Sequence, residues 1–335
     1  MSYLYVTEQG AMLSFNANRF EVKHKNGLLH SIPAETLEMI ELFGNIHMTT
    51  RCMQECLKRG INVVFFSSYG SYYGRLISTN HVNVRRQRLQ ADIGKNREFL
   101  LRLDKRMVSA KVHNQIVVLQ RYSQACRSRV VEELKTMKIM EKKIHNCEHS
   151  IDELMGFEGF AARAYFKGIG KIIDPDFRFN KRTRMPPRDP FNSMISLGYS
   201  ILLNEIYGKI EGKGLNPYFG VLHQDREKHP TLASDLMEEW RAVLIDTTVM
   251  GMISRGMAVI NDFAVDQEHE GVFLSEELFK KYVRRLEERF NESTSYLDYV
   301  PYSVSFRRAM DLQIQQLIKA FESEDPGLYH PIRIR

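Results

Sequence analysis

The sequence has few cysteines and no long uncharged apolar stretch. Its four cysteines form no C-x-x-C pair and are too sparse among 335 residues for a disulfide scaffold, so free thiols of a cytoplasmic protein are expected. No segment reaches the roughly 18 to 20 apolar residues of a membrane span, and residues 1–4 open no basic-then-apolar signal peptide. We therefore expect a soluble protein that is not exported.

Internal repeats, low-complexity segments and a G-x-x-x-x-G-K-[ST] loop are also absent from the sequence. Without that phosphate-binding loop, chemistry driven by nucleotide hydrolysis is not expected. What the chain does have is length and apolar content. Its 335 residues are 43% hydrophobic, enough for a sizeable core and about two domains.

The chain changes character after about residue 76. Before that point short strand-like runs alternate with turns, and Asn26-Gly27 predicts a tight hairpin because both residues tolerate positive φ. A helix is expected at 50–59. Beyond residue 86 the pattern is almost entirely helical. The predicted fold class is α+β: a small β-rich domain at 1–76, a linker at 77–86 and a large all-α domain at 87–335.

Positive charge is concentrated in residues 81–147. They contain 16 Lys/Arg and 6 Asp/Glu, an excess of +10, whereas the whole chain carries +6. Such an excess favours a nucleic-acid partner, because Lys and Arg neutralise backbone phosphates. A solvated helix face rich in Lys and Arg would give the same pattern, and both interpretations remain open for this segment.

A second basic segment lies at residues 171–188, where only Asp174 and Asp176 oppose six basic side chains. Phe177 and Phe179 are interleaved with the positive charges. This mixture suits a track for backbone phosphates with room for base stacking. The basic residues are Lys171, Arg178, Lys181, Arg182, Arg184 and Arg188.

Glu158 lies where packing alone would place an apolar residue. Ser150 and Glu153 form a capping box, which predicts a helix from there toward Gly168. Glu158 falls in the apolar stripe of that helix. A buried carboxylate must be paired, protonated or metal-bound, because isolated burial costs several kcal/mol. An ion pair with Arg163 or with a basic loop residue is the alternative to a metal ligand.

An imidazole and two further acids follow in the sequence. Asp189-Pro190 predicts the start of a core helix, after which a turn leads to His223. Residues 232–250 are expected to form the next helix, with Asp235 and Glu238 one turn apart on one face. A satisfied loop histidine and solvent-facing acids near a helix start are the simpler alternatives.

Together, Glu158, His223, Asp235 and Glu238 indicate a divalent-metal site. Oxygen ligands with one imidazole suit Mg²⁺ or Mn²⁺, whereas structural zinc would prefer Cys and more His. In a basic protein, phosphoryl chemistry is the natural use of such an ion. The metal would neutralise a phosphate oxygen, orient the nucleophile and stabilise the leaving 3′ oxygen.

Three segments carry a resemblance to a known family: EGFAARAYF at 158–166, NPYFGVLH at 216–223 and LASDLMEEWR at 232–241. They resemble the CRISPR-associated integrase family "Cas one", the catalytic subunit of spacer acquisition. The segment RMPPRDPFN at 184–192 resembles the family's link between the halves of its site. The similarity covers essentially the whole chain.

The resemblance implies a metal-dependent DNA integrase and endonuclease of CRISPR adaptation, an antiviral defense system. Glu158, His223 and Glu238 would be catalytic metal ligands for Mg²⁺ or Mn²⁺, with Asp235 in support; many relatives have Asp where Glu238 stands. A captured fragment's 3′ hydroxyl would attack a phosphodiester in the repeat array.

The implied partners are DNA, either double-stranded, branched or with 3′ overhangs, and a second copy of the chain. The homodimer would form largely through the β domains, and a small "Cas two" dimer would bridge two such homodimers. Charge alone predicts the DNA-binding residues Arg85, Arg86, Arg88, Arg178, Lys181, Arg182, Arg184 and Arg188.

Two other functions stay open. The chain could be a non-catalytic, architectural DNA-binding subunit whose acidic cluster is a structural ion-pair network. A metal phosphohydrolase of small substrates is the other possibility, but it leaves the excess charge of residues 81–147 without a use.

Overall fold

The chain folds into two compact units, Met1–Val82 and Asn83–Arg335. Our computed structural model describes residues 2–148, 150–266, 270–297 and 299–335. The first unit is rich in strands and the second is mostly helical, which confirms the predicted fold class. The division falls inside segment 77–86, expected to be a linker, and a helix starts there at Val84. Within the described residues, every helix is too short or too polar to cross a membrane.

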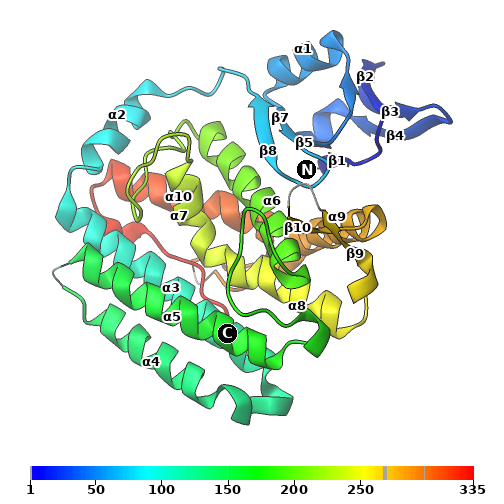
Figure 1. The fold of residues 1–335 in the computed structure, drawn as a ribbon. Coiled ribbons are helices and arrows are strands. Elements are labelled where there is room, and N and C mark those ends of the chain that lie inside the picture. Colours follow the sequence, from blue (N-terminus) through cyan, green and yellow to red (C-terminus); the bar gives the residue numbers. More distant parts are fainter. Residues whose placement is uncertain (1, 149, 267–269, 298) are drawn as a thin grey trace. The chain divides into compact units, whose positions relative to one another are not determined.

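Two four-stranded sheets form most of the first unit (Figure 1). One has the order β1-β5-β7-β8, in which β1 pairs parallel with β5 and β5 with β7, while β8 is antiparallel to β7. The other has the order β4-β3-β2-β6. The bounds are β1 Ser2–Val6, β2 Met12–Asn16, β3 Arg19–His24, β4 Gly27–Pro33, β5 Leu37–Phe43, β6 His47–Met48, β7 Asn62–Phe66 and β8 Tyr72–Leu76.

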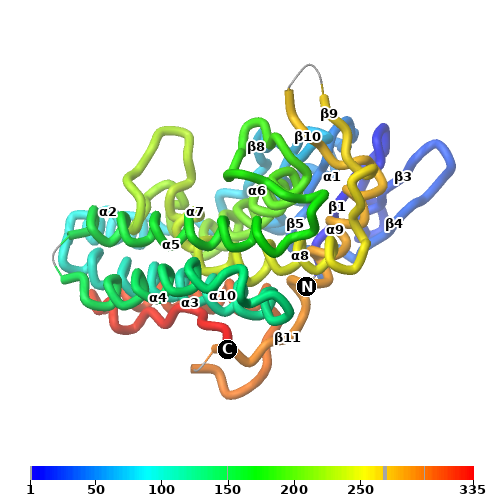
Figure 2. The backbone as a smooth tube through the Cα atoms, turned by 60° about the horizontal axis from the view of Figure 1, so that its bottom comes forward, coloured from blue at the N-terminus to red at the C-terminus, as the bar shows by residue number. Residues whose placement is uncertain are grey.

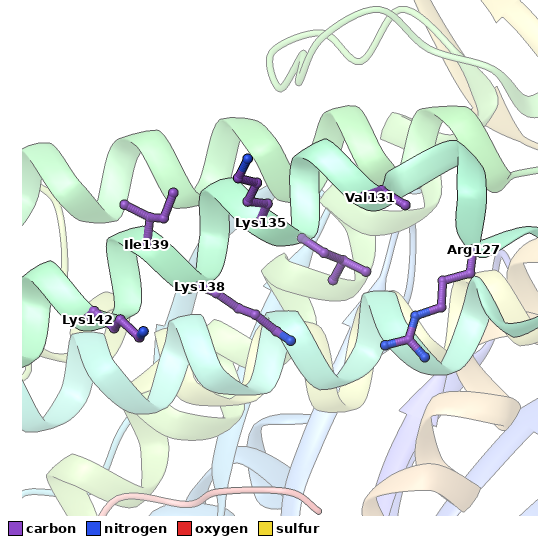
Figure 3. Close-up of a pocket in the computed structure, with 7 residues that line it drawn as sticks. Arg127, Val131, Lys135, Lys138, Ile139 and Lys142 are labelled. Atoms are coloured by element: carbon purple, nitrogen blue, oxygen red, sulfur yellow. The ribbon is translucent and has the colours of Figure 1, made fainter.

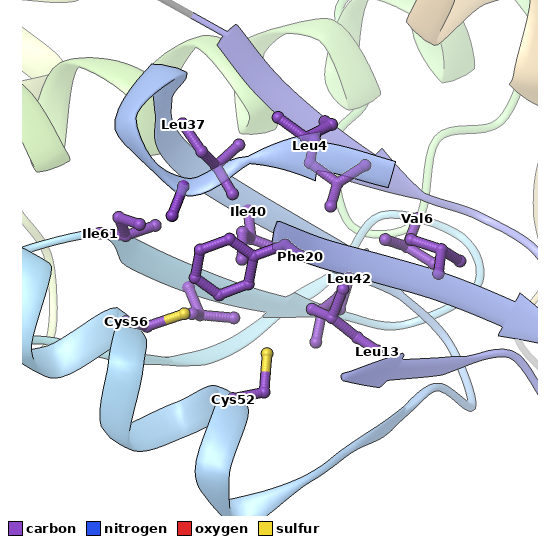
Figure 4. Close-up of a cluster of buried hydrophobic side chains, with 14 of the residues drawn as sticks. Leu4, Val6, Leu13, Phe20, Leu37, Ile40, Leu42, Cys52, Cys56 and Ile61 are labelled. Atoms are coloured by element: carbon purple, nitrogen blue, oxygen red, sulfur yellow. The ribbon is translucent and has the colours of Figure 1, made fainter. Parts of the chain in front are cut away.

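One apolar core joins both sheets to helix α1, Thr50–Arg59 (Figure 4). Phe20 of one sheet and Ile40 of the other are fully buried there, and Cys52 and Cys56 of α1 pack against them as apolar side chains. Burial on this scale gives the unit its own hydrophobic stabilisation. A hairpin forms here as predicted, because β3 ends at His24 and pairs antiparallel with β4, which begins at Gly27. Its two-residue loop is Lys25-Asn26, one position earlier than the predicted Asn26-Gly27, and of Asn26 and Gly27 only Gly27 has a positive φ.

Helices dominate the second unit (Figures 1 and 2), in which α3, α4 and α5 pack side by side. Segment 241–246 between α7 and α8 is π-helical. The bounds are α2 Val84–Ile93, α3 Arg97–Tyr122, α4 Val131–His145, α5 Ile151–Ile172, α6 Pro190–Gly212, α7 Thr231–Trp240, α8 Thr247–Ser254, α9 Glu276–Asn291 and α10 Phe306–Glu322. The short strands are β9 Phe263–Asp266, β10 Gly271–Leu274, β11 Ser293–Thr294 and β12 Val304–Ser305.

Polar N-caps fix the starts of the helices that position the site. Ser150 accepts a hydrogen bond from Glu153 N, so α5 begins where the capping box predicts. Asp189 accepts from Asn192 N at the start of α6, and Pro190 follows as the first helical residue. Both predicted helix starts are therefore confirmed.

The expected single helix at 232–250 is interrupted. Helix α7 ends at Trp240, and the π-helical turn follows before α8 begins at Thr247. Val243 O, inside this turn, accepts from Thr247 Oγ1 at 2.7 Å and from Arg289 Nη2 at 2.9 Å. Arg289 belongs to α9, so a distant element stabilises the break.

The last residues of the chain lie against α3 and α7. Tyr329, Ile332 and Ile334 are buried, and Ile334 N donates to Asn114 Oδ1 of α3 at 3.0 Å. Tyr329 Oη donates to Glu239 Oε1 of α7 at 2.6 Å, and Ile332 N donates to Glu239 Oε2 at 2.9 Å. The segment thus helps to fix α7 next to Glu238.

Candidate metal centre

Four parts of the helical unit bring the candidate side chains together. Helix α5 provides Glu158, the segment between α6 and α7 provides His223, and α7 provides Asp235 and Glu238. The fourth part is α3, which contributes Lys111, a residue that the sequence did not point to. The long helices α3 and α5 pack against each other, which sets their side chains face to face.

Lys111 joins the two glutamates. Its Nζ lies 2.5 Å from Glu158 Oε1 and 2.6 Å from Glu238 Oε2. Glu158 is therefore ion-paired, as one alternative expected, but with Lys111 of α3 rather than with Arg163 or a loop residue. Arg163 instead lies over the ring of Phe160. The lysine is only 8% exposed, so this contact is largely shielded from water.

Glu238 is held by two cations. Arg241 Nη1 lies 2.7 Å from its Oε1, opposite the contact that Lys111 makes with Oε2. Burial raises the pKa of Glu238, but Arg241 and Lys111 outweigh it and bring that pKa to about 2. Burial also lowers the pKa of Lys111, and the charges of Glu238 and Glu158 reverse this and raise it. Glu238 and Lys111 are therefore both charged at neutral pH.

Asp235 fixes the histidine segment. Its Oδ2 accepts from Val221 N at 2.8 Å and from Leu222 N at 2.9 Å, and its Oδ1 lies 2.6 Å from His223 Nδ1. Asp235 is fully buried, so the solvent-facing interpretation of this residue is wrong. The carboxylate instead satisfies backbone donors of a loop that has no regular structure of its own.

His223 is oriented by that carboxylate. The hydrogen bond with Asp235 raises the pKa of His223, against a lowering by burial. Because Nδ1 faces the carboxylate, Nε2 is the nitrogen left for another ligand, and no partner for it occurs among the described residues. A histidine whose second nitrogen is held by a carboxylate is the usual arrangement at metal sites.

The donor set suits a divalent cation in its chemistry. Two carboxylate oxygens from different helices point at one cation, and the buried Glu238 Oε2 accepts no directed hydrogen bond, although Lys111 Nζ is close. Yet nowhere in the described parts of the chain do three His, Cys, Asp or Glu side chains converge closely enough to hold a metal. The glutamates meet at Lys111, and His223 is paired separately with Asp235.

The helix surface next to Glu158 is open. A Cβ atom placed on Gly156 or on Gly159 would meet no atom within 4 Å. Glu158 itself has a side-chain exposure of 13%. The small residues of α5 therefore leave space beside the carboxylate.

Three more acids are buried near these elements and were not singled out from the sequence. Burial raises the pKa of Glu239 to about 7 and that of Asp246 to about 6. Burial, followed by the charge of Asp235, raises the pKa of Asp104 to about 9. Glu239 is fully buried, and Glu238 beside it is 4% exposed, so the solvent-facing interpretation is wrong for Glu238 as well as for Asp235.

The predicted DNA-binding arginines and lysines divide into two groups. Three contact the protein itself: Arg86 with Glu322 and Lys213 O, Arg182 with Asn192, and Arg188 with Glu270. The others are exposed and form no ion pair with any residue that the structure describes; they are Arg85, Arg88, Arg178, Lys181 and Arg184.

The two phenylalanines of the second basic segment are used inside the protein. Phe177 is 3% exposed and meets the ring of Phe263 edge-on, while Phe179 stacks on Phe191 at 4.5 Å between centroids. The expectation that they offer surfaces for base stacking is therefore wrong. The segment provides positive charge, and its aromatic rings anchor it to the helical core.

A separate basic pocket of about 430 Å³ lies along α4 (Figure 3). Val131 and Ile139 contribute exposed apolar surface to it. Four cations surround this surface: Arg127, Lys135, Lys138 and Lys142. Part of the excess charge of residues 81–147 is thus gathered on one helix face.

Lys111 could have been found by the reasoning that found Glu158. It follows Val108 and Ala110 and precedes Val112, all of which are fully buried. A lysine in such an apolar run needs an acidic partner for the same reason that a carboxylate needs a cation.

Fold and site define a protein with a small β unit and a helical unit that carries a buried cluster of carboxylates, an imidazole and two basic side chains. The sequence model described as "CRISPR associated protein Cas1" matches residues 4–288, and the chain belongs to this family.

Its relatives and structural neighbours agree. It is 37% identical over 327 residues, 98% of this chain and 96% of the relative, to "CRISPR-associated endonuclease Cas1" of Mycobacterium tuberculosis (strain CDC 1551 / Oshkosh).

A solved "Cas6-RT-Cas1--Cas2 complex" has a TM-score of 0.87 and 26% identity; the match covers 100% of this chain and 36% of that longer one. A "Casposase bound to integration product" has a TM-score of 0.85 and 21% identity, with 100% of this chain and 96% of that chain covered, and shows likeness of fold.

Proposed function

We propose that this chain is a metal-dependent DNA integrase and endonuclease of CRISPR adaptation. Glu158, His223 and Glu238 would hold one Mg²⁺ or Mn²⁺, and Asp235 would support them. The observation that carries the proposal is the convergence of Glu158 and Glu238, from two helices, on one cation position. Full-length relatives named as endonucleases add to it.

The residues of the proposed site have different roles. Asp235 keeps His223 Nδ1 occupied, which would leave Nε2 free to bind the metal. A bound divalent ion would neutralise a phosphate oxygen and stabilise the leaving 3′ oxygen. The open surface beside Gly156 and Gly159 leaves room for a DNA backbone at Glu158.

The substrates follow from the same proposal. The 3′ hydroxyl of a captured DNA fragment would attack a phosphodiester of the repeat array, so one bond forms as another breaks and no ATP is needed. Exposed Arg178, Lys181 and Arg184 would contact DNA phosphates. We further propose a homodimer through the β-rich unit. We also propose a Cas2 partner, which the similarity to the solved Cas6-RT-Cas1--Cas2 complex favours.

The test is a strand-transfer assay with Mn²⁺ in which a branched DNA product is measured for the wild type and for the His223→Ala variant. We expect joining to be abolished, because a nitrogen ligand is lost. His229→Ala is the matched control, since His229 lies in the same segment and is exposed, and within the described residues the one hydrogen bond of its side chain is with Ser234 Oγ. Joining by His223→Ala at the wild-type rate would refute the proposal.

The architectural alternative has a specific observation in its favour, namely the ion pairs of Lys111 with Glu158 and Glu238. It predicts DNA binding without metal-dependent cleavage or joining. It also predicts that Glu158→Gln lowers the unfolding temperature, because a buried ion pair is broken. Measuring DNA binding and metal-dependent joining on one preparation distinguishes an integrase from an architectural subunit.

A further inference from the structure

Lys111 occupies the point at which the two glutamates converge. Its Nζ lies within 2.6 Å of one oxygen of each, and it reaches them from α3, a third helix. Oxygen ligands bind Mg²⁺ at about 2.0 to 2.1 Å. A metal ion held by Glu158 Oε1 and Glu238 Oε2 would therefore overlap the position of this ammonium.

The charges balance without a metal. Glu158 and Glu238 contribute two negative charges, and Lys111 and Arg241 contribute two positive charges that contact them directly. Adding a divalent cation while Lys111 stays would leave like charges a few ångströms apart in a poorly solvated place, which is strongly unfavourable. Metal binding and the lysine contact therefore exclude each other.

Without any cation, the pair of glutamates would be unstable. Glu238 is 4% exposed and cannot be solvated as a free carboxylate would be. Arg241 contacts Glu238 but has no contact with Glu158 among the described residues. Lys111 is thus the group that keeps α5 and α7 together at this point when no metal is bound.

We propose that Lys111 is a built-in cation that holds the carboxylates in place and is displaced when the metal binds. The inference rests on the proposed function, because it takes Glu158 and Glu238 as metal ligands. Lys111 is a positioning residue: it keeps the site assembled, and it lowers the affinity for metal by competing for the same oxygens.

The experiment is calorimetric titration of the full-length, metal-free protein with MnCl₂ at constant pH and salt. Lys111→Met should bind Mn²⁺ at least about tenfold more tightly than wild type, because no ammonium has to leave. Lys209→Met is the matched control: Lys209 is also 8% exposed and paired with an acid, Asp311 at 3.3 Å. It should leave the affinity unchanged.

A second readout is thermal unfolding followed by Trp240, the one tryptophan of the chain, which is fully buried. Without metal, Lys111→Met should unfold at a lower temperature than wild type, and Mn²⁺ should restore most of the difference. The loss in Lys209→Met should not be restored. If the methionine variant does not fold, Lys111→Gln, which keeps a hydrogen-bond donor, takes its place in both measurements.

The failures can be told apart. If wild type and Lys111→Met bind Mn²⁺ equally well, or the variant binds it more weakly, the displacement is refuted while the metal site stands. If neither protein binds Mn²⁺, the proposed metal site fails and the inference fails with it. A tightening in Lys209→Met as large as that in Lys111→Met would also refute the specific role.

Discussion

Asp104 is the buried acid whose surroundings are least favourable to charge. It is fully buried on α3, and neither of its carboxylate oxygens has a hydrogen-bond partner among the residues described. Burial and the charge of Asp235 raise its pKa from 3.8 to about 9. At neutral pH the folded protein therefore keeps a proton on Asp104 that the unfolded chain has lost.

This sets the sign of a pH effect on stability. Between about pH 4 and pH 9 the folded state binds one more proton than the unfolded state, so this group's contribution to stability falls as the pH rises. The change is at most about 1.4 kcal/mol per pH unit. The contribution is most favourable below pH 4, the reverse of a salt-bridged carboxylate.

Asp104→Asn should remove this dependence. We expect its free energy of unfolding, relative to wild type, to increase steadily from pH 5 to pH 9, measured by urea unfolding and Trp240 fluorescence. Asp92→Asn is the control, because Asp92 has a side-chain exposure of 72% and pairs with Lys95 on the surface. Parallel wild-type and Asp104→Asn profiles would show that Asp104 does not carry the proton.

At this scale the sequence was informative where a residue broke an apolar pattern. Glu158 and His223 stood out in that way. In the structure, Lys111 links Glu158 to Glu238, and the Nδ1 atom of His223 contacts Asp235. The contacts themselves could not be read from the sequence. They join residues 47 positions apart in one case and 12 in the other, and they depend on how α3, α5 and α7 pack.

The conformation of the segment that carries His223 depends on one glycine, Gly220. A Cβ atom on Gly220 would lie 2.4 Å from Thr231 Cγ2 and 2.8 Å from His223 O. The second contact is with backbone, so the segment would have to move. Gly220 N also donates to Asp225 Oδ1 at 2.7 Å, which ties the turn together.

Gly220→Ala should therefore displace His223 from Asp235. We expect weaker Mn²⁺ binding by calorimetry and slower strand transfer, with a loss of stability of about 1 to 3 kcal/mol from overpacking. Gly212→Ala is the control, because a Cβ there meets nothing within 4 Å at the end of α6. Normal Mn²⁺ binding in Gly220→Ala would mean that the position of His223 does not depend on this turn.

Elements with strong local signals were predictable, and those that depend on distant partners were not. The starts of α5 and α6 follow from their caps, Ser150 and Asp189. The π-helical turn after Trp240 depends on Arg289 of α9, which donates to Val243 O from 46 residues away. Periodicity in a short window cannot reveal such a contact, and residues 232–250 therefore looked like one helix.

The order of a strand-rich unit followed by a helical unit was predictable for the whole molecule, because the change in periodicity is abrupt and the two units have separate cores. The distribution of charge was visible as well. Which basic side chains remain available was not, since Arg86, Arg182 and Arg188 engage partners from other parts of the chain.

The basic side chains that remain exposed in segment 171–188 allow a test of the hypothesis that this segment binds DNA phosphates. Replacing Arg178, Lys181 and Arg184 by alanine lowers the net charge from +6 to +3, because three positive charges are lost. Each phosphate contact adds about 0.9 to the slope of log affinity against log salt concentration. If all three contact DNA, the slope should therefore decrease by about 2 to 3, measured by fluorescence anisotropy with a labelled duplex.

A control with the same net charge separates contacts from overall attraction. Lys58 and Lys280 lie on α1 and α9, and Lys95 lies in the turn after α2; each of the three pairs with an acid three or four residues earlier in the sequence. Replacing these three lysines by alanine also gives +3, yet it should leave the salt slope close to that of the wild type. Equal decreases in both triple variants would mean that DNA responds to the total charge of the protein, and the segment at 171–188 would then have no special part in binding.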